Sequence, residues 1–213
     1  MKIAMVGSGA AGSVFASYLR AGGADMTLID PYKAHMDAVR DNGMKFTIYP
    51  DKTTVLTGFH TAYTADEVDT MDIVIFMTKA NQLENAIQGA KHCIGENTVL
   101  VSLINGLGND DKLVAAVGPS RVIYGSGSLG TALDGPGKCI SSPGAREIQM
   151  NFGAVENNPL TEKVGKYLEE CFTNGGCPAK FWDDVRPPLW RKIVSNCVLN
   201  SLCAITRLKA KDV

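Results

Sequence analysis

The chain has 213 residues, 45% of them apolar and 20% charged, with a net charge of −1. This composition is ordinary for a globular protein and lacks the basic excess that would indicate a nucleic-acid or anionic-membrane partner. No apolar stretch reaches the ~18 residues that span a bilayer, and no signal peptide precedes the first strand, so a cytoplasmic protein is expected. Six cysteines form no CxxC pair, which predicts reduced thiols and no metal site.

Short apolar runs alternate with helical patterns through the first two-thirds of the chain. This alternation predicts an α/β fold with a Rossmann-like parallel sheet covered by helices on both faces. The predicted strands are 3–6, 26–29, 73–77 and 99–103, and the predicted helices are 10–21, 33–41, 83–92 and 111–117.

The pattern changes after Arg121 to closely spaced short runs, which predict added strands joined by turns. A long helix follows Pro187-Pro188, and a domain boundary is expected between Phe181 and Pro187. The remaining predicted elements are strands at 122–124, 128–133, 139–141, 147–150 and 179–182 and a helix at 160–172.

A glycine-rich turn follows the first predicted strand and begins the first predicted helix. In a GxGxxG turn the first glycine permits the tight bend, the second lets backbone approach a pyrophosphate, and the third lets helix and strand pack closely. Its position within a strand–helix–strand frame predicts a dinucleotide site. The residues of this turn are Gly7, Ser8, Gly9, Ala10, Ala11 and Gly12.

Asp30 ends the second predicted strand, where a carboxylate binds the ribose 2′-hydroxyl of NAD and repels the 2′-phosphate of NADP. The acid therefore favours NADH. Lys33 and Arg40 follow closely in the sequence and could offset the repulsion. An alternative or additional role for Asp30 is to cap a helix that has Pro31 at its first position.

Polar side chains follow two further strands at the edge of the sheet where ligands bind. Lys79 and Gln82 come after the strand 73–77, and Asn105 comes after 99–103. These side chains are expected over the cofactor cleft. The alternatives are an exposed loop lysine and an ordinary Asn-Gly turn.

Lys192, Asn196 and Asn200 are spaced four apart in the long apolar helix, so they share one stripe of its surface. A helix apolar on its other sides is expected to be buried, and buried polar groups need partners. The stripe is therefore a candidate site, with interhelical hydrogen bonds as the alternative.

Several motifs combine along the chain into one pattern. They are Gly7, Gly9 and Gly12, Lys79-Ala80-x-Gln82, Asn105-Gly106-x-Gly108, the stretch 125–137, and Trp190-Arg191-Lys192 with Asn196 and Asn200. Together they resemble the ketopantoate reductase (2-dehydropantoate 2-reductase) family over essentially the whole chain.

The resemblance implies reduction of a 2-oxo acid by NADPH or NADH, with 2-dehydropantoate converted to D-pantoate in pantothenate biosynthesis. It implies that Lys192 is the general acid and that Asn105 positions the nicotinamide and the reacting carbonyl. Burial among apolar neighbours is expected to lower the pKa of Lys192 toward a useful range.

The same resemblance assigns the binding residues and the domains. Lys79 and Gln82 line the cofactor site, and Asn196 and Asn200 hold substrate oxygens. A dinucleotide-binding domain is expected over residues 1–183, followed over 184–213 by the start of an incomplete helical domain for substrate binding and dimerisation.

Two departures from the family pattern keep alternatives open. Family members typically use NADPH and often carry a basic residue where this chain has Asp30-Pro31, so Asp30 and His35 look more like the NAD-dependent D-2-hydroxyacid dehydrogenases of the D-mandelate type. Family members also continue into further helices. A non-catalytic dinucleotide-binding fragment therefore remains an alternative, and the apolar final helix favours a homodimer over a monomer.

Overall fold

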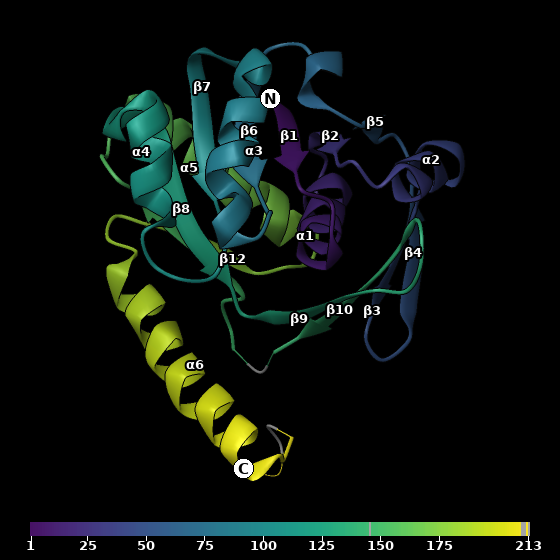
Figure 1. Ribbon diagram of the computed structural model, residues 1–213, viewed down its shortest axis with the longest axis vertical. Helices are drawn as coiled ribbons and strands as arrows, with labels where there is room; N and C mark the ends of the chain where they lie inside the picture. Colours follow the sequence, from purple (N-terminus) through teal and green to yellow (C-terminus); the bar gives the residue numbers. More distant parts are fainter. Residues whose placement is uncertain (145, 210–211, 213) are drawn as a thin grey trace.

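A computed structural model describes residues 1–144, 146–209 and 212 of the chain. The polypeptide forms an eight-stranded sheet with helices on both faces, a separate four-stranded sheet and a long final helix that extends away from the rest (Figure 1). The predicted α/β fold with a Rossmann-like sheet is confirmed.

The eight-stranded sheet is parallel except for the pairing of β8 with β11. Strand β1 lies between β2 and β6, so the chain changes direction across the sheet at β1 and β6. Ligands of such sheets bind at this reversal, beyond the carboxyl ends of the strands. In spatial order the strands are β12 (Ala179–Trp182), β11 (Met150–Ala154), β8 (Val122–Gly127), β7 (Ile94–Ser102), β6 (Met71–Phe76), β1 (Lys2–Val6), β2 (Asp25–Ile29) and β5 (His60–Ala62).

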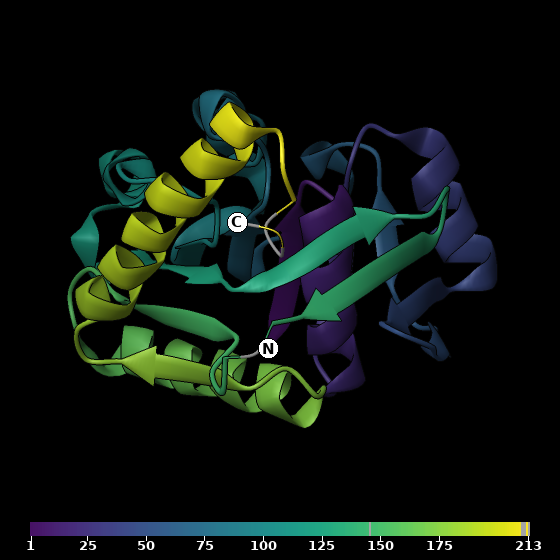
Figure 2. The ribbon, with the colours of Figure 1, turned by 90° about the horizontal axis from the view of Figure 1, so that it is seen from below.

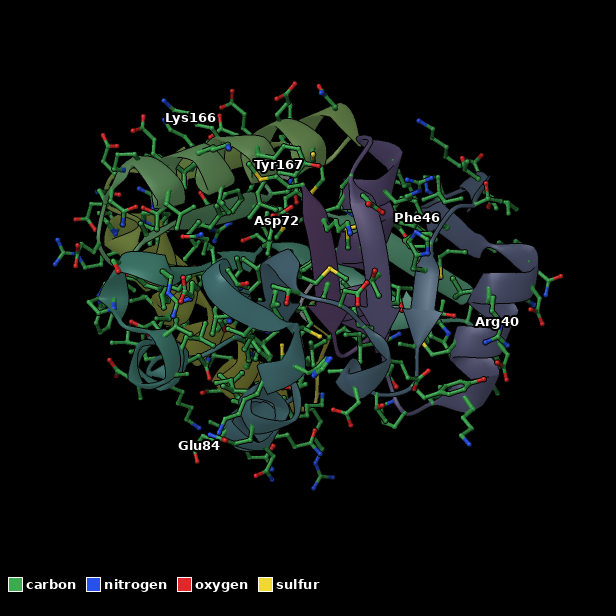
Figure 3. The ribbon with its side chains drawn as sticks, turned by 90° about the horizontal axis from the view of Figure 1, so that it is seen from above. Arg40, Phe46, Asp72, Glu84, Lys166 and Tyr167 are labelled. Carbon is green, nitrogen blue, oxygen red and sulfur yellow. The ribbon has the colours of Figure 1, made fainter. Side chains whose placement is uncertain are left out.

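Successive side chains of a strand point to opposite faces of the sheet. Both faces of this sheet carry buried apolar side chains, and helices cover both. In β1, Ile3 and Met5 join the core under α1 and α5, whereas Ala4 joins the core under α3 and α4. Figure 3 shows α5, with Lys166 and Tyr167, on one face and Glu84 of α3 on the other. The helices are α1 (Ala10–Ala21), α2 (Lys33–Asn42), α3 (Leu83–Gly89), α4 (Asn109–Val117), α5 (Pro159–Asn174) and α6 (Arg186–Thr206), with 3-10 turns η1 (Ala65–Glu67), η2 (Ala80–Gln82), η3 (Lys91–Cys93) and η4 (Pro119–Arg121).

The four-stranded sheet packs on the other side of α1, so this helix lies between two sheets. Figure 2 shows β9 and β10 passing in front of α1. The Tyr18 ring meets Phe46 edge to face at 4.9 Å, and its hydroxyl lies 2.8 Å from Ser141 Oγ. The strand order is β4 (Lys52–Leu56), β3 (Met44–Ile48), β10 (Lys138–Pro143) and β9 (Leu129–Leu133).

The predicted elements all have counterparts in the structure, but one of them is misplaced and three strands were not predicted. Helix α1 and strand β12 have the predicted bounds. The prediction of a strand at 147–150 was wrong in position, because β11 begins at Met150 and places Phe152 in the core. Strands β3, β4 and β5 were not predicted, since β4 is almost wholly exposed and polar and β5 has three residues.

Helix α6 contradicts the expectation of burial. None of its residues is buried, and Trp190 and Ile205 are 54% and 80% exposed. Only its first half adjoins the body, whereas its far end projects away from the sheets (Figure 1). The exposed apolar side chains of the second half need a cover that the described residues do not provide.

None of the helices in the described ranges combines the length and apolar character needed to cross a bilayer. The described part of the chain holds no cluster of three or more His, Cys, Asp or Glu side chains arranged to bind a metal ion. All six cysteines carry free thiols.

His35 is fully buried at the junction between α2, α1 and the four-stranded sheet. Its Nδ1 accepts a hydrogen bond from the Gly137 N–H at 2.9 Å, and its Nε2 lies 3.0 Å from Ser13 Oγ. Burial lowers the pKa of the imidazole, and the nearby Asp30 carboxylate opposes this only partly. The folded chain therefore holds a neutral histidine.

This burial predicts a pH-dependent stability. The unfolded chain takes up a proton on His35 near pH 6.5, but the folded chain does so only at lower pH. The stabilisation is present above the unfolded-state pKa and is lost as the pH falls through the folded-state pKa. Urea unfolding midpoints should therefore fall on acidification, and His35→Gln should flatten that fall. The same change at exposed His92 is the control, and equal pH profiles for the two variants would contradict the prediction.

Candidate functional site

A groove of about 1220 Å³ lies beyond the carboxyl ends of β1 and β6, where the sheet reverses its strand order. Most of the residues expected to bind cofactor line it. These are Gly7, Gly9, Ala10, Ala11, Asp30, Lys79, Gln82 and Asn105.

The three glycines of the first turn meet the requirements of a dinucleotide site. Gly7 has φ +95° and lies against Met77, so that a Cβ there would come within 2.9 Å of the Met77 carbonyl carbon. A Cβ on Gly12 would lie 1.9 Å from the Gly7 oxygen, so only glycine lets α1 start this close to β1. A Cβ on Gly9 would meet no atom within 4 Å and would instead occupy the groove where phosphates approach.

Ser8 provides a second observation at the same turn. Its Oγ is buried and has no hydrogen-bond partner within the described chain, an arrangement that is costly unless a ligand satisfies it. Its backbone N–H donates to Asp30 Oδ2 at 2.7 Å. The donor set, the open space over Gly9 and the N-terminus of α1 together fit a pyrophosphate.

Asp30 is positioned by backbone donors on both sides. Its Oδ1 accepts from the Tyr32 N–H at 2.9 Å, and its Oδ2 accepts from Ser8. Helix α2 begins at Lys33 and its N-cap is Tyr32, so the idea that Asp30 caps a helix beginning at Pro31 is wrong. The carboxylate still lines the groove and retains lone pairs for ribose hydroxyls.

The two cations that could have offset Asp30 are engaged elsewhere. Arg40 pairs with Asp37 and also approaches the Tyr63 hydroxyl, and Lys33 Nζ lies 5.3 Å above the Tyr63 ring. Neither residue lines the groove. Among the described residues that do line it, Asp30 and Asp66 are acidic and Lys79 is the sole cation. This balance disfavours an additional 2′-phosphate beside Asp30.

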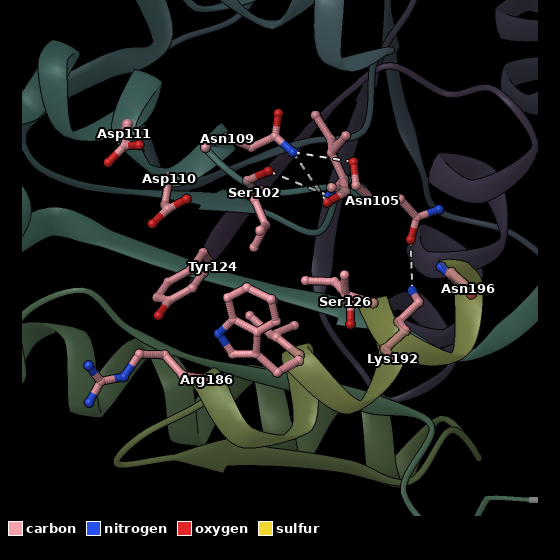
Figure 4. Close-up of a pocket in the computed structure, with 18 residues that line it drawn as sticks. Ser102, Asn105, Asn109, Asp110, Asp111, Tyr124, Ser126, Arg186, Lys192 and Asn196 are labelled. Atoms are coloured by element: carbon pink, nitrogen blue, oxygen red, sulfur yellow. Dashed lines mark hydrogen bonds between the residues drawn. The ribbon is translucent and has the colours of Figure 1, made fainter. Parts of the chain in front are cut away.

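Lys192 meets Asn105 across the gap between α6 and the main sheet (Figure 4). Its Nζ donates to Asn105 Oδ1 at 2.7 Å and to the Gly127 carbonyl oxygen. An ammonium has three N–H donors, so one remains for a ligand. Burial, with a smaller contribution from the Arg146 charge, lowers the pKa of Lys192 to about 8.

A smaller cavity of about 240 Å³ adjoins the groove on the other side of Asn105, which lines both. Lys192 and Asn196 also line this cavity, and Figure 4 shows Asn196 beside the Lys192–Asn105 hydrogen bond. Asn200, one turn further along α6, is exposed and lines neither space. The structure therefore brings together two of the three residues of the stripe.

Several residues of this cavity were not among the predicted site residues, although Trp190 and Ser126 lie within the motifs that carried the family resemblance. Tyr124 and Ser126 come from β8, and Trp190 comes from α6. The Gly127 carbonyl that holds Lys192 could not be found from residue types, because any residue supplies a carbonyl. The aromatic residues carried a weak signal at best, since isolated Trp and Tyr side chains usually pack in cores.

Comparison with known proteins gives consistent matches. The family model described as ketopantoate reductase PanE/ApbA matches residues 3–157. The 2-dehydropantoate 2-reductase of Lactococcus lactis is 30% identical over 206 residues, which are 96% of this chain and 64% of that protein. The chain thus spans about two-thirds of the length of such relatives.

Two solved structures share the fold. D-mandelate dehydrogenase, solved with NADH and anilino(oxo)acetate, matches with a TM-score of 0.81 and 27% identity, over 98% of this chain and 65% of the other. The 2-dehydropantoate 2-reductase of Geobacter metallireducens matches with a TM-score of 0.80 and 25% identity, over 97% of this chain and 66% of the other.

The position of Asp30 generates a prediction about cofactor preference. Asp30→Ser removes the charge but keeps an oxygen that can accept from the Ser8 N–H, so the ratio of kcat/KM for NADPH to that for NADH should rise about tenfold. Asp51→Ser, in the exposed turn after β3, is the matched control and should leave the ratio unchanged. An unaltered ratio in Asp30→Ser would remove Asp30 from cofactor selection.

Proposed function

The chain belongs to the ketopantoate reductase PanE/ApbA family, and we propose that it reduces the C2 carbonyl of a small 2-oxo acid with NAD(P)H. The leading substrate is 2-dehydropantoate, with D-pantoate as product, as in the pantothenate pathway. The observation that carries the proposal is the Lys192 ammonium bound to Asn105, where the dinucleotide groove meets the smaller cavity.

Lys192 is suited to deliver a proton in this reaction. When bound, the dinucleotide supplies the hydride that adds to the carbonyl carbon. Two donors of Lys192 are held by Asn105 and Gly127, which fixes the ammonium and leaves the remaining N–H for a substrate oxygen. The charge of Lys192 stabilises the alkoxide oxygen, and a pKa of about 8 lets it give up a proton near neutral pH.

The remaining site residues take supporting roles in the proposal. Asn105 orients both Lys192 and the reacting carbonyl, and Asn196 holds a substrate oxygen from the adjoining turn of α6. Lys79 and Gln82 border the cofactor groove from the loop after β6. Asn200 acts only if substrate or further chain extends to its exposed position.

A second candidate within the same chemistry is an NAD-dependent D-2-hydroxyacid dehydrogenase. It is favoured by Asp30 in the groove and by the engagement of Lys33 and Arg40 elsewhere, which both support NADH over NADPH. The likeness to a D-mandelate dehydrogenase that binds NADH supports it further.

The domain division is also part of the proposal. Residues 1–183 contain both sheets and α1 to α5, and α6 departs from this body at Arg186. We assign 1–183 to dinucleotide binding and 184–213 to the beginning of a helical domain. The exposed apolar side of α6 would be covered there or in a homodimer.

The substrate assignment and the role of Lys192 are tested in one assay of NADH and NADPH oxidation with 2-dehydropantoate and with an aryl 2-oxo acid. Lys192→Ala should lower kcat at least a hundredfold, because the proton donor is lost, with the dissociation constant for NADH nearly unchanged. Lys180→Ala, at the one exposed position of β12, is the control. Dinucleotide binding without turnover of any 2-oxo acid by the unaltered chain would instead establish a non-catalytic binding module.

The pKa of Lys192 sets the expected pH profile. The ammonium is the form that donates, so kcat/KM for reduction should fall as the pH rises through about 8. The reverse oxidation needs the neutral amine as base and should rise over the same range. Lys192→Arg keeps a positive charge that does not titrate there, so any residual activity should lose this transition. A profile that is flat around pH 8 in the unaltered chain would contradict the assignment.

A further inference from the structure

A continuous path of hydrogen bonds connects the turn between β9 and β10 to the glycine-rich turn. The Gly137 N–H donates to His35 Nδ1 at 2.9 Å, and His35 Nε2 lies 3.0 Å from Ser13 Oγ. The Ser13 hydroxyl in turn lies 2.7 Å from the carbonyl oxygen of Ser8. His35 and Ser13 are both fully buried, so water does not compete for these contacts.

The direction of each hydrogen bond follows from its neighbour. Gly137 offers an N–H, so His35 Nδ1 must be the accepting nitrogen and the proton of the neutral imidazole resides on Nε2. The imidazole therefore donates to Ser13 Oγ. The Ser13 hydroxyl proton is then directed to the Ser8 carbonyl, which can only accept.

The Ser8 carbonyl determines where the next amide points. A trans peptide unit is planar, and its C=O and N–H point in opposite directions. With the Ser8 oxygen directed inward to Ser13, the Gly9 N–H of the same peptide is directed outward. Gly9 lines the groove, and the space over its Cα is open.

We propose that His35 is a positioning residue for the dinucleotide: through Ser13 it fixes the Ser8–Gly9 peptide so that the Gly9 N–H faces the pyrophosphate. This inference rests on the proposed dinucleotide site. His35 touches no cofactor. It determines the direction of one hydroxyl proton, and it links the four-stranded sheet, through Gly137, to the orientation of one amide in the groove.

Two substitutions of His35 separate its two contacts. Gln places an amide near the position of Nε2 and can still donate to Ser13, whereas Asn places an oxygen near Nδ1 and can still accept from Gly137. The proposal expects His35→Asn to raise the dissociation constant for NADH about tenfold and His35→Gln to raise it less than about threefold. Ser13→Ala should match His35→Asn, and the double variant should be no worse than either single variant.

The readout is equilibrium binding of NADH to the folded chain, followed by titration calorimetry, with unfolding midpoints measured on the same samples. The matched control is Ser17→Ala, one turn further along α1, where a buried hydroxyl bonds the Ser13 carbonyl oxygen at 2.7 Å and not the glycine-rich turn. This control should lose stability as Ser13→Ala does but keep its affinity for NADH. In steady state the His35→Asn effect should fall on the KM for NADH and leave kcat within about threefold.

The outcomes are distinct. Unchanged NADH affinity in folded His35→Asn and Ser13→Ala overturns the inference while leaving the proposed function intact. Equal losses of affinity in the Gln and Asn variants, or in Ser17→Ala, show a general packing role and also overturn it. Failure of the unaltered chain to bind NADH overturns both the inference and the proposed function.

Discussion

Helix α1 is held against its neighbours at distances that only glycine permits. At its start, a Cβ on Gly12 would lie 1.9 Å from the Gly7 oxygen. At its end, a Cβ on Gly22 would lie 1.8 Å from the Cys171 oxygen of α5, and one on Gly175 would lie 1.9 Å from the Tyr18 oxygen. Both ends of α1 are thus in close contact with backbone atoms of neighbouring segments. Its buried side chains belong to a core that also contains residues of both sheets. The N-terminus that faces the groove is therefore set by packing along the whole helix.

The site depends on a second constraint, the placement of one charge by two oxygens. Lys192 sits on a helix that has few contacts with the body, yet its ammonium is held by Asn105 of one strand end and by Gly127 of another. Partial burial disfavours the charged form, and the two acceptors do not restore the ordinary pKa. The burial that accompanies this anchoring, together with the Arg146 charge, therefore makes Lys192 a weaker base and a more ready proton donor.

Local signals in the sequence predicted the parts of the fold that depend on local physics. The GxGxxG turn, the bounds of α1 and the alternation of strand and helix each reflect constraints within a few residues, and all agree with the structure. Strands β3 and β4 pair with each other locally, but β4 is almost wholly exposed, and the pairing of β3 with β10 joins residues some ninety positions apart, so neither strand carries a clear local signal. Helix α6 fails for a different reason. Its apolar sequence predicts burial, but burial requires other parts of the protein to pack against it, and the helix sequence does not show whether they do.

The residues of the candidate site were also predicted only as far as local spacing allows. Asn105 and Lys192 were predicted separately, and in the structure Lys192 Nζ lies 2.7 Å from Asn105 Oδ1. Asn196 follows Lys192 into the cavity because one helical turn keeps it on the same side. Asn200 does not, since the stripe drifts as the helix leaves the sheet. Spacing along a helix predicts a shared face but not how far the opposing surface extends.

Ser8 contacts both Asp30, proposed to select the cofactor, and Ser13, proposed to help position it. Its N–H is held by Asp30 and its carbonyl by Ser13, so both peptide groups that flank Ser8 are oriented from opposite sides. In the proposed dinucleotide site, a carboxylate at Asp30 therefore has two roles: it disfavours a 2′-phosphate, and it orients the turn proposed to receive the pyrophosphate. Replacing it with a basic residue would remove the repulsion but also the acceptor for the Ser8 N–H. If the proposed preference for NADH holds, conversion to NADPH use requires an acceptor in place of the carboxylate as well as a cation, because charge and orientation are supplied here by one side chain.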